Sequence, residues 1–193
     1  MHGKSLQSMR KMSNEPSPPD WMAYAHRLNL PLPHWRLWVV LATQELYRFN
    51  GKDIDRVYTI SSSRLGPGNE QDSFKTPTGL HRVAAYIGQD APIGTVFSGR
   101  EPTGHVLPAA NWHGRDPADL ILSRILWLEG LEYSNRGGRV DTYRRYIYLH
   151  GTNHEHRLGQ PSSAGCIRMA NQAIVELFSD VHQQPCWCLI QPE

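Results

Sequence analysis

Residues 148–169 read YLHGTNHEHRLGQPSSAGCIRM. A short apolar run ends in a His-Gly pair. A polar loop with a glycine and a proline then leads to a Gly-Cys pair, after which a second short apolar run begins. Short apolar runs bounded by such turn residues are typical of β-strands. Scaffolds commonly hold functional side chains where a strand gives way to a loop. We therefore predict that this loop folds back and brings Cys166 beside His150.

The same strand signals recur along most of the chain. The segments rich in β-branched and aromatic residues, each bounded by Gly, Pro, Asn or Asp, are 36–43, 45–49, 56–63, 80–88, 95–99, 145–151 and 186–191. Many short strands separated by turn residues predict a mainly β fold, either a β-sandwich or a partly closed barrel, with a few short helices.

Two stretches have the signals of a helix inside this β-rich region. In residues 171–181 the apolar side chains recur at helical spacing, at Ile174, Leu177, Phe178 and Val181. Residues 116–130 open with Asp116-Pro117, a plausible cap and first turn, and then run apolar. We interpret the second stretch as a weaker helix, with a loop followed by a strand as the alternative.

The N-terminal part differs in composition from the rest. Residues 1–33 are expected to form a flexible lead with one short helix, because residues 1–19 are polar and end in a proline-rich run. Asp20 is placed to cap that helix, which should extend to about Leu28. Residues 34–193 contain neither a repeat nor a composition shift, so we expect them to form one domain.

Charge and hydropathy exclude two classes of partner. The 193 residues carry 20 basic and 18 acidic side chains, interspersed, for a net charge of +2. Because the basic side chains do not gather in a dense run, we expect no nucleic-acid partner. No run of about 20 apolar residues is present, so we expect no membrane span. Residues 1–30 also lack the apolar core of a secretory signal, which leaves a cytoplasmic location open.

Three cysteines occur, at positions 166, 186 and 188. They cannot all pair within one chain, and the Cys-Trp-Cys spacing is poor for a bridge between Cys186 and Cys188, so at least one thiol should be free. Cys186 and Cys188 share one face of a strand and are expected to fill the core. For Cys166 the residues alone leave three roles open: a buried filler, a metal ligand or a nucleophile.

The interpretation of Cys166 as a nucleophile rests on its neighbours. A cysteine attacks as a thiolate, and His150 can accept its proton or hold an ion pair with it. Gly165 leaves room for an incoming carbonyl, and successive backbone N–H groups there can form an oxyanion hole. Arg168 points to the same face as Cys166 in extended backbone, where it can lower the thiol pKa, hold a substrate carboxylate or serve as a structural bridge.

The metal reading uses a different set of side chains. The candidate ligands are His150, His154, His156 and Cys166. Their spacings do not match a familiar zinc site, and His154 and His156 flank Glu155 in a loop that we expect to be solvated. We therefore expect neither a metal nor another cofactor.

Two separated segments together resemble the signature of the YkuD-type L,D-transpeptidases. The His-Gly-Thr of residues 150–152 and the Ser-x-Gly-Cys-Ile-Arg-Met of residues 163–169 match its two parts. Upstream, LWVVLATQELYRFN at 37–50 resembles the opening hairpin of that family, and KTPTGLHRVAAYIG at 75–88 resembles its Thr-Pro-x-Gly segment. The resemblance covers roughly residues 35–191.

The resemblance implies a β-rich fold of two curved sheets and acyl transfer on peptidoglycan stem peptides by a monomer located in the cell envelope. In that reaction Cys166 attacks the carbonyl of the L-centre of diaminopimelate, and the terminal D-alanine leaves with a proton from His150. An amine of a neighbouring stem then takes the acyl group to form a 3-3 cross-link. The alternatives are L,D-carboxypeptidase trimming, in which water takes it, and a non-catalytic peptidoglycan-binding module.

The resemblance also assigns supporting residues. The carbonyl of Gly151 is implied to orient His150 through its other ring nitrogen, so that no carboxylate is needed. The residues implied to support the oxyanion and the loops are Gly151, Thr152, Ser163 and Gly165. Arg168 and Asn153 are placed at the substrate pocket, and Asn153 is also expected to fix its loop together with Thr152. Ala164 departs from the pattern, because many members carry histidine there.

Overall fold

A computed structural model describes residues 17–114 and 118–193. The chain forms two compact units, which divide between Leu32 and Pro33. Most of the flexible lead expected at residues 1–19 therefore lies outside the described residues. The helix start expected at Asp116-Pro117 lies wholly outside them. No helix in the described ranges is both long and apolar enough to cross a membrane.

In the N-terminal unit, the short helix forms as predicted. Helix α1 spans Trp21–Leu28, and the carboxylate of Asp20 accepts a hydrogen bond from the backbone N–H of Ala23 at 3.0 Å. This bond satisfies one of the N–H groups that have no partner within the first turn. Asn29, with φ of 50°, ends the helix in the left-handed conformation that asparagine tolerates.

The second unit is mainly β, as the sequence predicted. Its strands are β1 (Trp35–Val40), β2 (Glu45–Asn50), β3 (Asp53–Ser61), β4 (Gly79–Ile87), β5 (Thr95–Ser98), β6 (Glu101–Val106), β7 (Ile121–Gly130), β8 (Tyr148–Gly151), β9 (Ile167–Met169) and β10 (Cys186–Gln191). Its helices are α2 (Asn171–Val181) and the short 3₁₀ turns η2 (Ala109–Asn111), η3 (Gly138–Val140) and η4 (Glu155–Arg157).

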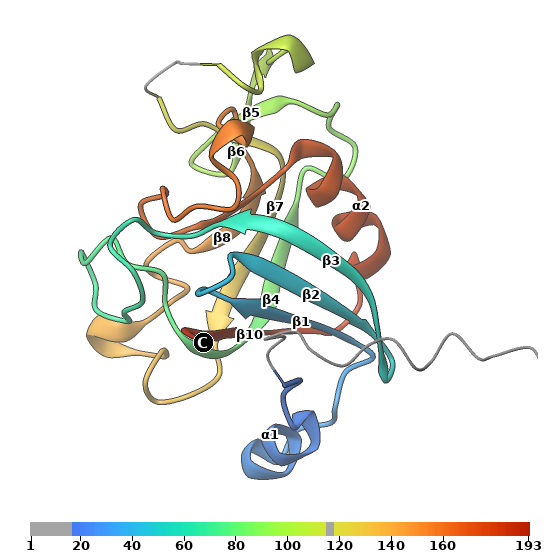
Figure 1. Ribbon diagram of the computed structural model, residues 1–193, viewed down its shortest axis with the longest axis vertical. Coiled ribbons are helices and arrows are strands. Elements are labelled where there is room, and N and C mark those ends of the chain that lie inside the picture. Colours follow the sequence, from blue (N-terminus) through green and yellow to red (C-terminus); the bar gives the residue numbers. More distant parts are fainter. Residues whose placement is uncertain (1–16, 115–117) are drawn as a thin grey trace, which may run out of the picture. The chain divides into compact units, whose positions relative to one another are not determined.

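The strands form one sheet that closes on itself. Their order is β4-β10-β1-β2-β3-β9-β8-β7-β5-β6, and β4 also pairs with β7, which completes a ring of pairings. The β5–β6 hairpin continues from β7 outside this ring, at the end away from β1 and β10 (Figure 1). Two pairs, β1–β10 and β8–β9, are parallel. The second of these joins the two segments of the predicted signature.

The helical interpretation of residues 116–130 is wrong, and its alternative is correct. Residues 121–130 form β7, which is buried along almost its whole length. It pairs with β4, β8 and β5, and both of its faces are covered, so no polar alternation marks it as a strand.

Strands β6 and β9 were not predicted either. β6 is exposed throughout and contains a proline and a glycine, and β9 has only three residues.

Helix α2 covers the core beside the predicted site. It occupies the predicted residues and buries the predicted apolar stripe, namely Ile174, Leu177, Phe178 and Val181, in the main hydrophobic core. Its first N–H group, that of Asn171, donates to the Glu155 carboxylate at 2.8 Å. A carboxylate at this end also complements the helix dipole. Glu155 therefore ties the loop after β8 to the start of α2.

His81 gives a testable dependence of stability on pH. Burial lowers its pKa to about 4, against an ordinary value of 6.5. As pH falls, the unfolded chain therefore takes up this proton first, and stability present above pH 6.5 is lost between about 6.5 and 4. The expected loss is about 3 kcal/mol. Urea unfolding at several pH values measures it, and His81→Gln, which does not titrate, should lose less. Equal acid sensitivity of the two proteins would contradict this origin.

Candidate active site

His150 is held in a defined orientation at the end of β8. Its side chain is 3% exposed, and its Nδ1 lies 2.7 Å from the carbonyl oxygen of Gly151. Because a carbonyl only accepts, Nδ1 must carry the proton. The neutral ring then has its other nitrogen, Nε2, available as an acceptor. This is the hydrogen bond that the sequence comparison implied for Gly151.

Gly151 must be a glycine for steric reasons. A Cβ atom at this position would lie 2.3 Å from Oδ1 of Asn171 and 2.8 Å from the backbone oxygen of Leu122. Asn171 is itself fixed, because its Nδ2 donates to the carbonyl oxygen of Thr152 at 2.8 Å. The close approach of α2 and β7 to β8 therefore depends on the missing side chain.

Cys166 is a free thiol immediately before β9, and part of its side chain reaches solvent. Its sulfur accepts a hydrogen bond from the backbone N–H of Tyr148 at 3.4 Å. The thiol can also donate to the carbonyl oxygen of Tyr146, which lies 3.5 Å away. The backbone leading into β8 therefore holds the sulfur in place.

Strand register puts Cys166 and His150 on the same face of the sheet. Leu149 pairs with Ile167, and both belong to the main core. Side chains alternate along a strand, so the residues on either side of this pair point to the opposite face. Cys166 does pack on that opposite side, against a second cluster that contains Tyr148. His150 lies two residues after Tyr148 and therefore on the same face, so β8 carries His150 on the face toward which Cys166, just before β9, packs.

Two hydroxyl groups hold the turn before Cys166. Ser163 Oγ donates to the carbonyl oxygen of Cys166 at 2.6 Å and accepts from the N–H of Gly165 at 3.3 Å. Thr76 Oγ1 donates to the carbonyl oxygen of Gly165 at 2.9 Å. Gly165 has φ of 130°, which favours glycine. Its N–H is occupied by Ser163, and this fits loop support rather than an oxyanion contact. Sequence reasoning missed Thr76 as a site residue, although it lies in the quoted Thr-Pro-x-Gly segment.

Arg168 is surrounded by protein partners. Its side chain is 1% exposed, and Nη1 donates to the Asp119 carboxylate at 3.0 Å. Nη2 donates to the hydroxyl of Ser61 at 2.9 Å and also to that of Ser162. Nη1 lies 3.4 Å from Nδ1 of His154. These contacts favour the structural bridge among the predicted roles, because a guanidinium that is 1% exposed is closed to a substrate carboxylate.

Asn153 and Thr152 also act inside the protein. Asn153 is 1% exposed, accepts from the N–H of Leu120 at 3.0 Å and donates to the carbonyl oxygen of Ala118 at 2.9 Å. Thr152 Oγ1 accepts from the N–H of His154 at 3.0 Å. Both residues therefore fix loops, and the burial of Asn153 disfavours the predicted contact with substrate.

Comparison with known proteins identifies the family of this chain. The family model of the L,D-transpeptidase catalytic domain named YkuD matches residues 34–184. The chain belongs to the YkuD family. This bears out the resemblance drawn from the two signature segments. L,D-transpeptidases act on peptidoglycan. No curated protein matches the sequence.

Solved structures similar to this YkuD domain are distant in sequence. An L,D-transpeptidase from Mycobacterium smegmatis is 13% identical with a TM-score of 0.49, and the match covers 82% of this chain but 59% of that one. The Ldtfm–avibactam carbamoyl enzyme is 15% identical with a TM-score of 0.52, over 86% of this chain and 52% of that one. The chain therefore spans little more than half the length of these structures, and the second likeness supports the fold alone.

The loop after β8 in this YkuD domain is solvated at His156, as expected, but not at His154. His154 is 4% exposed, because it packs beside Arg168 and Asp119. Glu155, its neighbour, is engaged at the start of α2. In the described ranges, no group of three or more His, Cys, Asp or Glu side chains is arranged to hold a metal ion.

The electrostatics of the site keep both predicted reacting groups neutral. The pKa of the Cys166 thiol is raised to about 11, chiefly by burial and also by Asp119, against the N–H of Tyr148 and the charges of Arg168 and Arg145, which lower it. Burial also lowers the pKa of His150. At neutral pH the site therefore holds a thiol and a neutral imidazole. Arg168 lowers the thiol pKa, as expected, but burial outweighs it.

This charge state predicts how Cys166 reacts with a small alkylating reagent. Because only the thiolate reacts, the rate with iodoacetamide should rise about tenfold for each pH unit between 7 and 10. Mass spectrometry of the labelled peptide separates Cys166 from the buried Cys186 and Cys188. Asp119→Asn should shift the profile to lower pH, since Asp119 raises the thiol pKa. A plateau in the wild-type rate below pH 8 would contradict the expected state.

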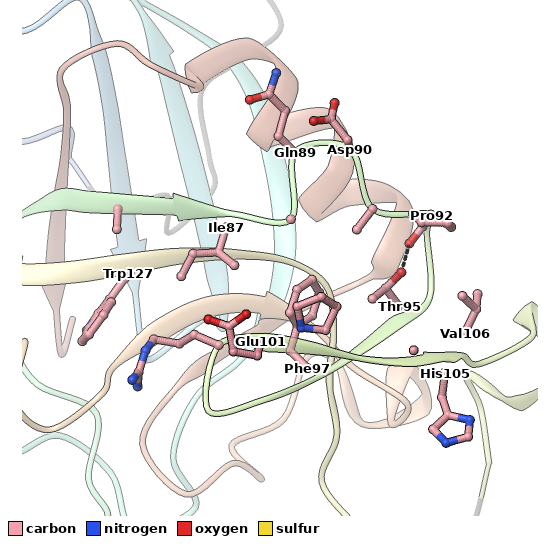
Figure 2. A pocket seen from close by; sticks show the side chains of 16 residues that line it. Ile87, Gln89, Asp90, Pro92, Thr95, Phe97, Glu101, His105, Val106 and Trp127 are labelled. Carbon is pink, nitrogen blue, oxygen red and sulfur yellow. Dashed lines mark hydrogen bonds between the residues drawn. The ribbon is translucent and has the colours of Figure 1, made fainter.

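A cavity of about 730 Å³ is lined by residues of β4, β5, β6 and β7 and of the loops between them. Trp127 lies at one end and Val106 and His105 lie at the other, with Phe97 and Glu101 between them (Figure 2). Phe97 and Trp127 also belong to the cluster against which Cys166 packs. Two residues of this cluster therefore also line the cavity, and the β5–β6 hairpin forms much of the cavity's lining.

Proposed function

We propose that this YkuD domain is a cysteine-dependent acyltransferase that forms 3-3 cross-links between peptidoglycan stem peptides. The observation that carries the proposal is the pairing of β8 with β9. This pairing supports the proposal because it joins the strand that carries His150 to the strand that follows Cys166, and because His150 Nδ1 is bound to Gly151, which leaves Nε2 free to accept a proton. No carboxylate is needed to orient the ring, because the backbone carbonyl does so.

In the first half-reaction, His150 Nε2 takes the Cys166 proton as the sulfur attacks the carbonyl of the L-centre of diaminopimelate. The C–S bond forms and the carbonyl electrons move to oxygen. When the tetrahedral intermediate collapses, the C–N bond breaks and the imidazolium returns its proton to the leaving nitrogen of D-alanine. The product is a thioester on Cys166. This order suits the neutral thiol and imidazole of the site.

In the second half-reaction, the side-chain amine of a neighbouring stem attacks the thioester. His150 accepts a proton from the attacking amine, the new amide C–N bond forms, and the C–S bond breaks with the proton returning to sulfur. If water attacks instead, the product is a tripeptide stem and the activity is that of an L,D-carboxypeptidase. The two activities differ only in the acceptor.

Two measurements test the proposal. Incubation with a disaccharide tetrapeptide should yield cross-linked dimers by mass spectrometry, whereas tripeptide alone would indicate trimming. A carbapenem should add covalently to the wild-type protein, as seen by intact mass, and should not add to Cys166→Ala. If the wild type forms no adduct, or the variant forms an equal one, the thiol is not the nucleophile. Stem-peptide binding without turnover by the wild type would favour the non-catalytic module.

A further inference from the structure

The turn between β5 and β6 places an arginine in an unusual backbone conformation. Gly99 and Arg100 have φ of 55° and 77°, the two positive angles of a tight hairpin turn. Glycine adopts such angles freely, but arginine does so rarely. A residue held in a sparsely populated conformation persists only when its surroundings favour it, and such residues cluster at functional sites.

The contacts of Arg100 explain where the turn directs it. The guanidinium carbon lies 4.7 Å from the ring centre of Trp127 and 5.0 Å from that of Tyr146. Nη1 donates to the hydroxyl oxygen of Tyr148 at 3.3 Å. Tyr146 and Tyr148 are the residues whose backbone contacts the sulfur of Cys166. The turn therefore holds a positive charge on the aromatic side chains beside the thiol.

This charge is not neutralised by the described part of the chain. Arg100 makes no salt bridge there, even with its neighbour Glu101, and only one of its five N–H groups donates to a described residue. Arg100 also lines the cavity of about 730 Å³, together with Trp127 and Phe97. A guanidinium with free donors beside an apolar wall is suited to bind a carboxylate in two parallel hydrogen bonds.

We propose that Arg100 is a specificity-determining residue that binds a carboxylate of the stem peptide held at Cys166. The inference rests on the proposed function, because it takes the substrate from there. The proposal concerns the two carboxylates on the residues joined by the scissile bond: the C-terminal carboxylate of the leaving D-alanine and the side-chain carboxylate of diaminopimelate. Arg100 contacts the substrate and takes no part in proton transfer.

The test compares three stem peptides: the natural tetrapeptide, its C-terminal amide and its diaminopimelate side-chain amide. For the wild type, kcat/KM should fall roughly 10- to 100-fold for the amide that removes the bound carboxylate, and this identifies the source. Arg100→Gln should lose a similar factor with the natural peptide and nothing further with that amide. Arg100→Lys should keep part of the discrimination, because it keeps the charge but not the paired donors.

Arg144→Gln is the matched control, since Arg144 is an exposed arginine that does not line this cavity. It should discriminate among the three peptides as the wild type does. If Arg100→Gln also discriminates as the wild type does, or if neither amide affects the wild type, the proposal is overturned. Equal loss by Arg100→Gln on all three peptides would show that Arg100 only packs the aromatic cluster.

Binding separates this inference from the proposed function. Calorimetry on Cys166→Ala measures affinity for the same three peptides without turnover. Arg100-dependent preference for the carboxylate in this background, with no turnover by the wild type, would refute the proposed function and leave the carboxylate site standing. Turnover by the wild type without any Arg100-dependent preference for the carboxylate would refute the carboxylate site and leave the proposed function standing.

Discussion

Replacing Cys166 with serine is expected to lower the rate of thioester or ester formation at least about a thousandfold. The substitution keeps the shape of the side chain and the backbone contacts of Tyr146 and Tyr148. It replaces a thiol by a hydroxyl that holds its proton far more tightly, and His150 has a lowered pKa that makes it a weak base. A thousandfold loss corresponds to about 4 kcal/mol of transition-state stabilisation.

Loss of this size requires that no other thiol replaces Cys166. Cys186 and Cys188 lie buried in β10, and burial raises the pKa of both thiols. Cys188→Ala is therefore the control: it should cost about 1 kcal/mol of folding stability and leave turnover unchanged. Single-turnover assays and thermal melting measure the two effects. A Cys166→Ser protein with more than a tenth of wild-type activity would contradict the proposed nucleophile.

Replacing Arg168 with methionine is expected to lower the free energy of unfolding by about 3 kcal/mol, or roughly 10 °C in Tm. The guanidinium bridges Ser61 at the end of β3, Ser162 in the loop before Cys166, and Asp119. Methionine fills much of the volume but leaves these groups without their donor. Asp119 is 39% exposed and can regain water, which limits the loss.

The same variant decides between the two predicted roles of Arg168. A residue that held a substrate carboxylate would change KM and leave stability unaffected, whereas a structural bridge lowers stability first. Arg168→Lys should lose most of the same stability, because one ammonium cannot reach all of these partners. Arg136→Met, at an exposed arginine that lies 3.7 Å from Glu129, should change stability by less than about 0.5 kcal/mol. Unchanged unfolding of Arg168→Met would contradict the structural role.

Local pattern was enough to predict much of the fold. The stripe of residues 171–181 predicted α2 with its observed bounds, and the seven apolar segments all fall on strands. The pattern failed at β7, because a strand buried on both faces has the same apolar run as a buried helix. It also failed at β6, whose residues are all exposed and so leave no apolar signal.

The candidate site was predicted in part. Cys166 and His150 were selected from a motif, and the turn before Cys166 was expected to be rigid. Asp119, Thr76 and Arg100 were not selected, because each comes from a separate part of the chain and only Thr76 lies in a quoted motif. Nothing in the sequence around Arg100 marks it, since its role depends on Trp127 and two tyrosines that it meets only after folding.

The sequence by itself determined most of the strands, the helices of residues 21–28 and 171–181, the family and the pair of side chains at which to look, since these depend on local periodicity and on short motifs. Only the tertiary structure decided that β4 closes the sheet on β7, that the Arg168 charge is enclosed by Asp119 and two serines, and that burial keeps the thiol protonated at neutral pH. A pKa depends on the local dielectric, and a hydrogen bond depends on a partner that can come from a distant position in the chain. Both the low dielectric and the partner are present only after the chain has folded.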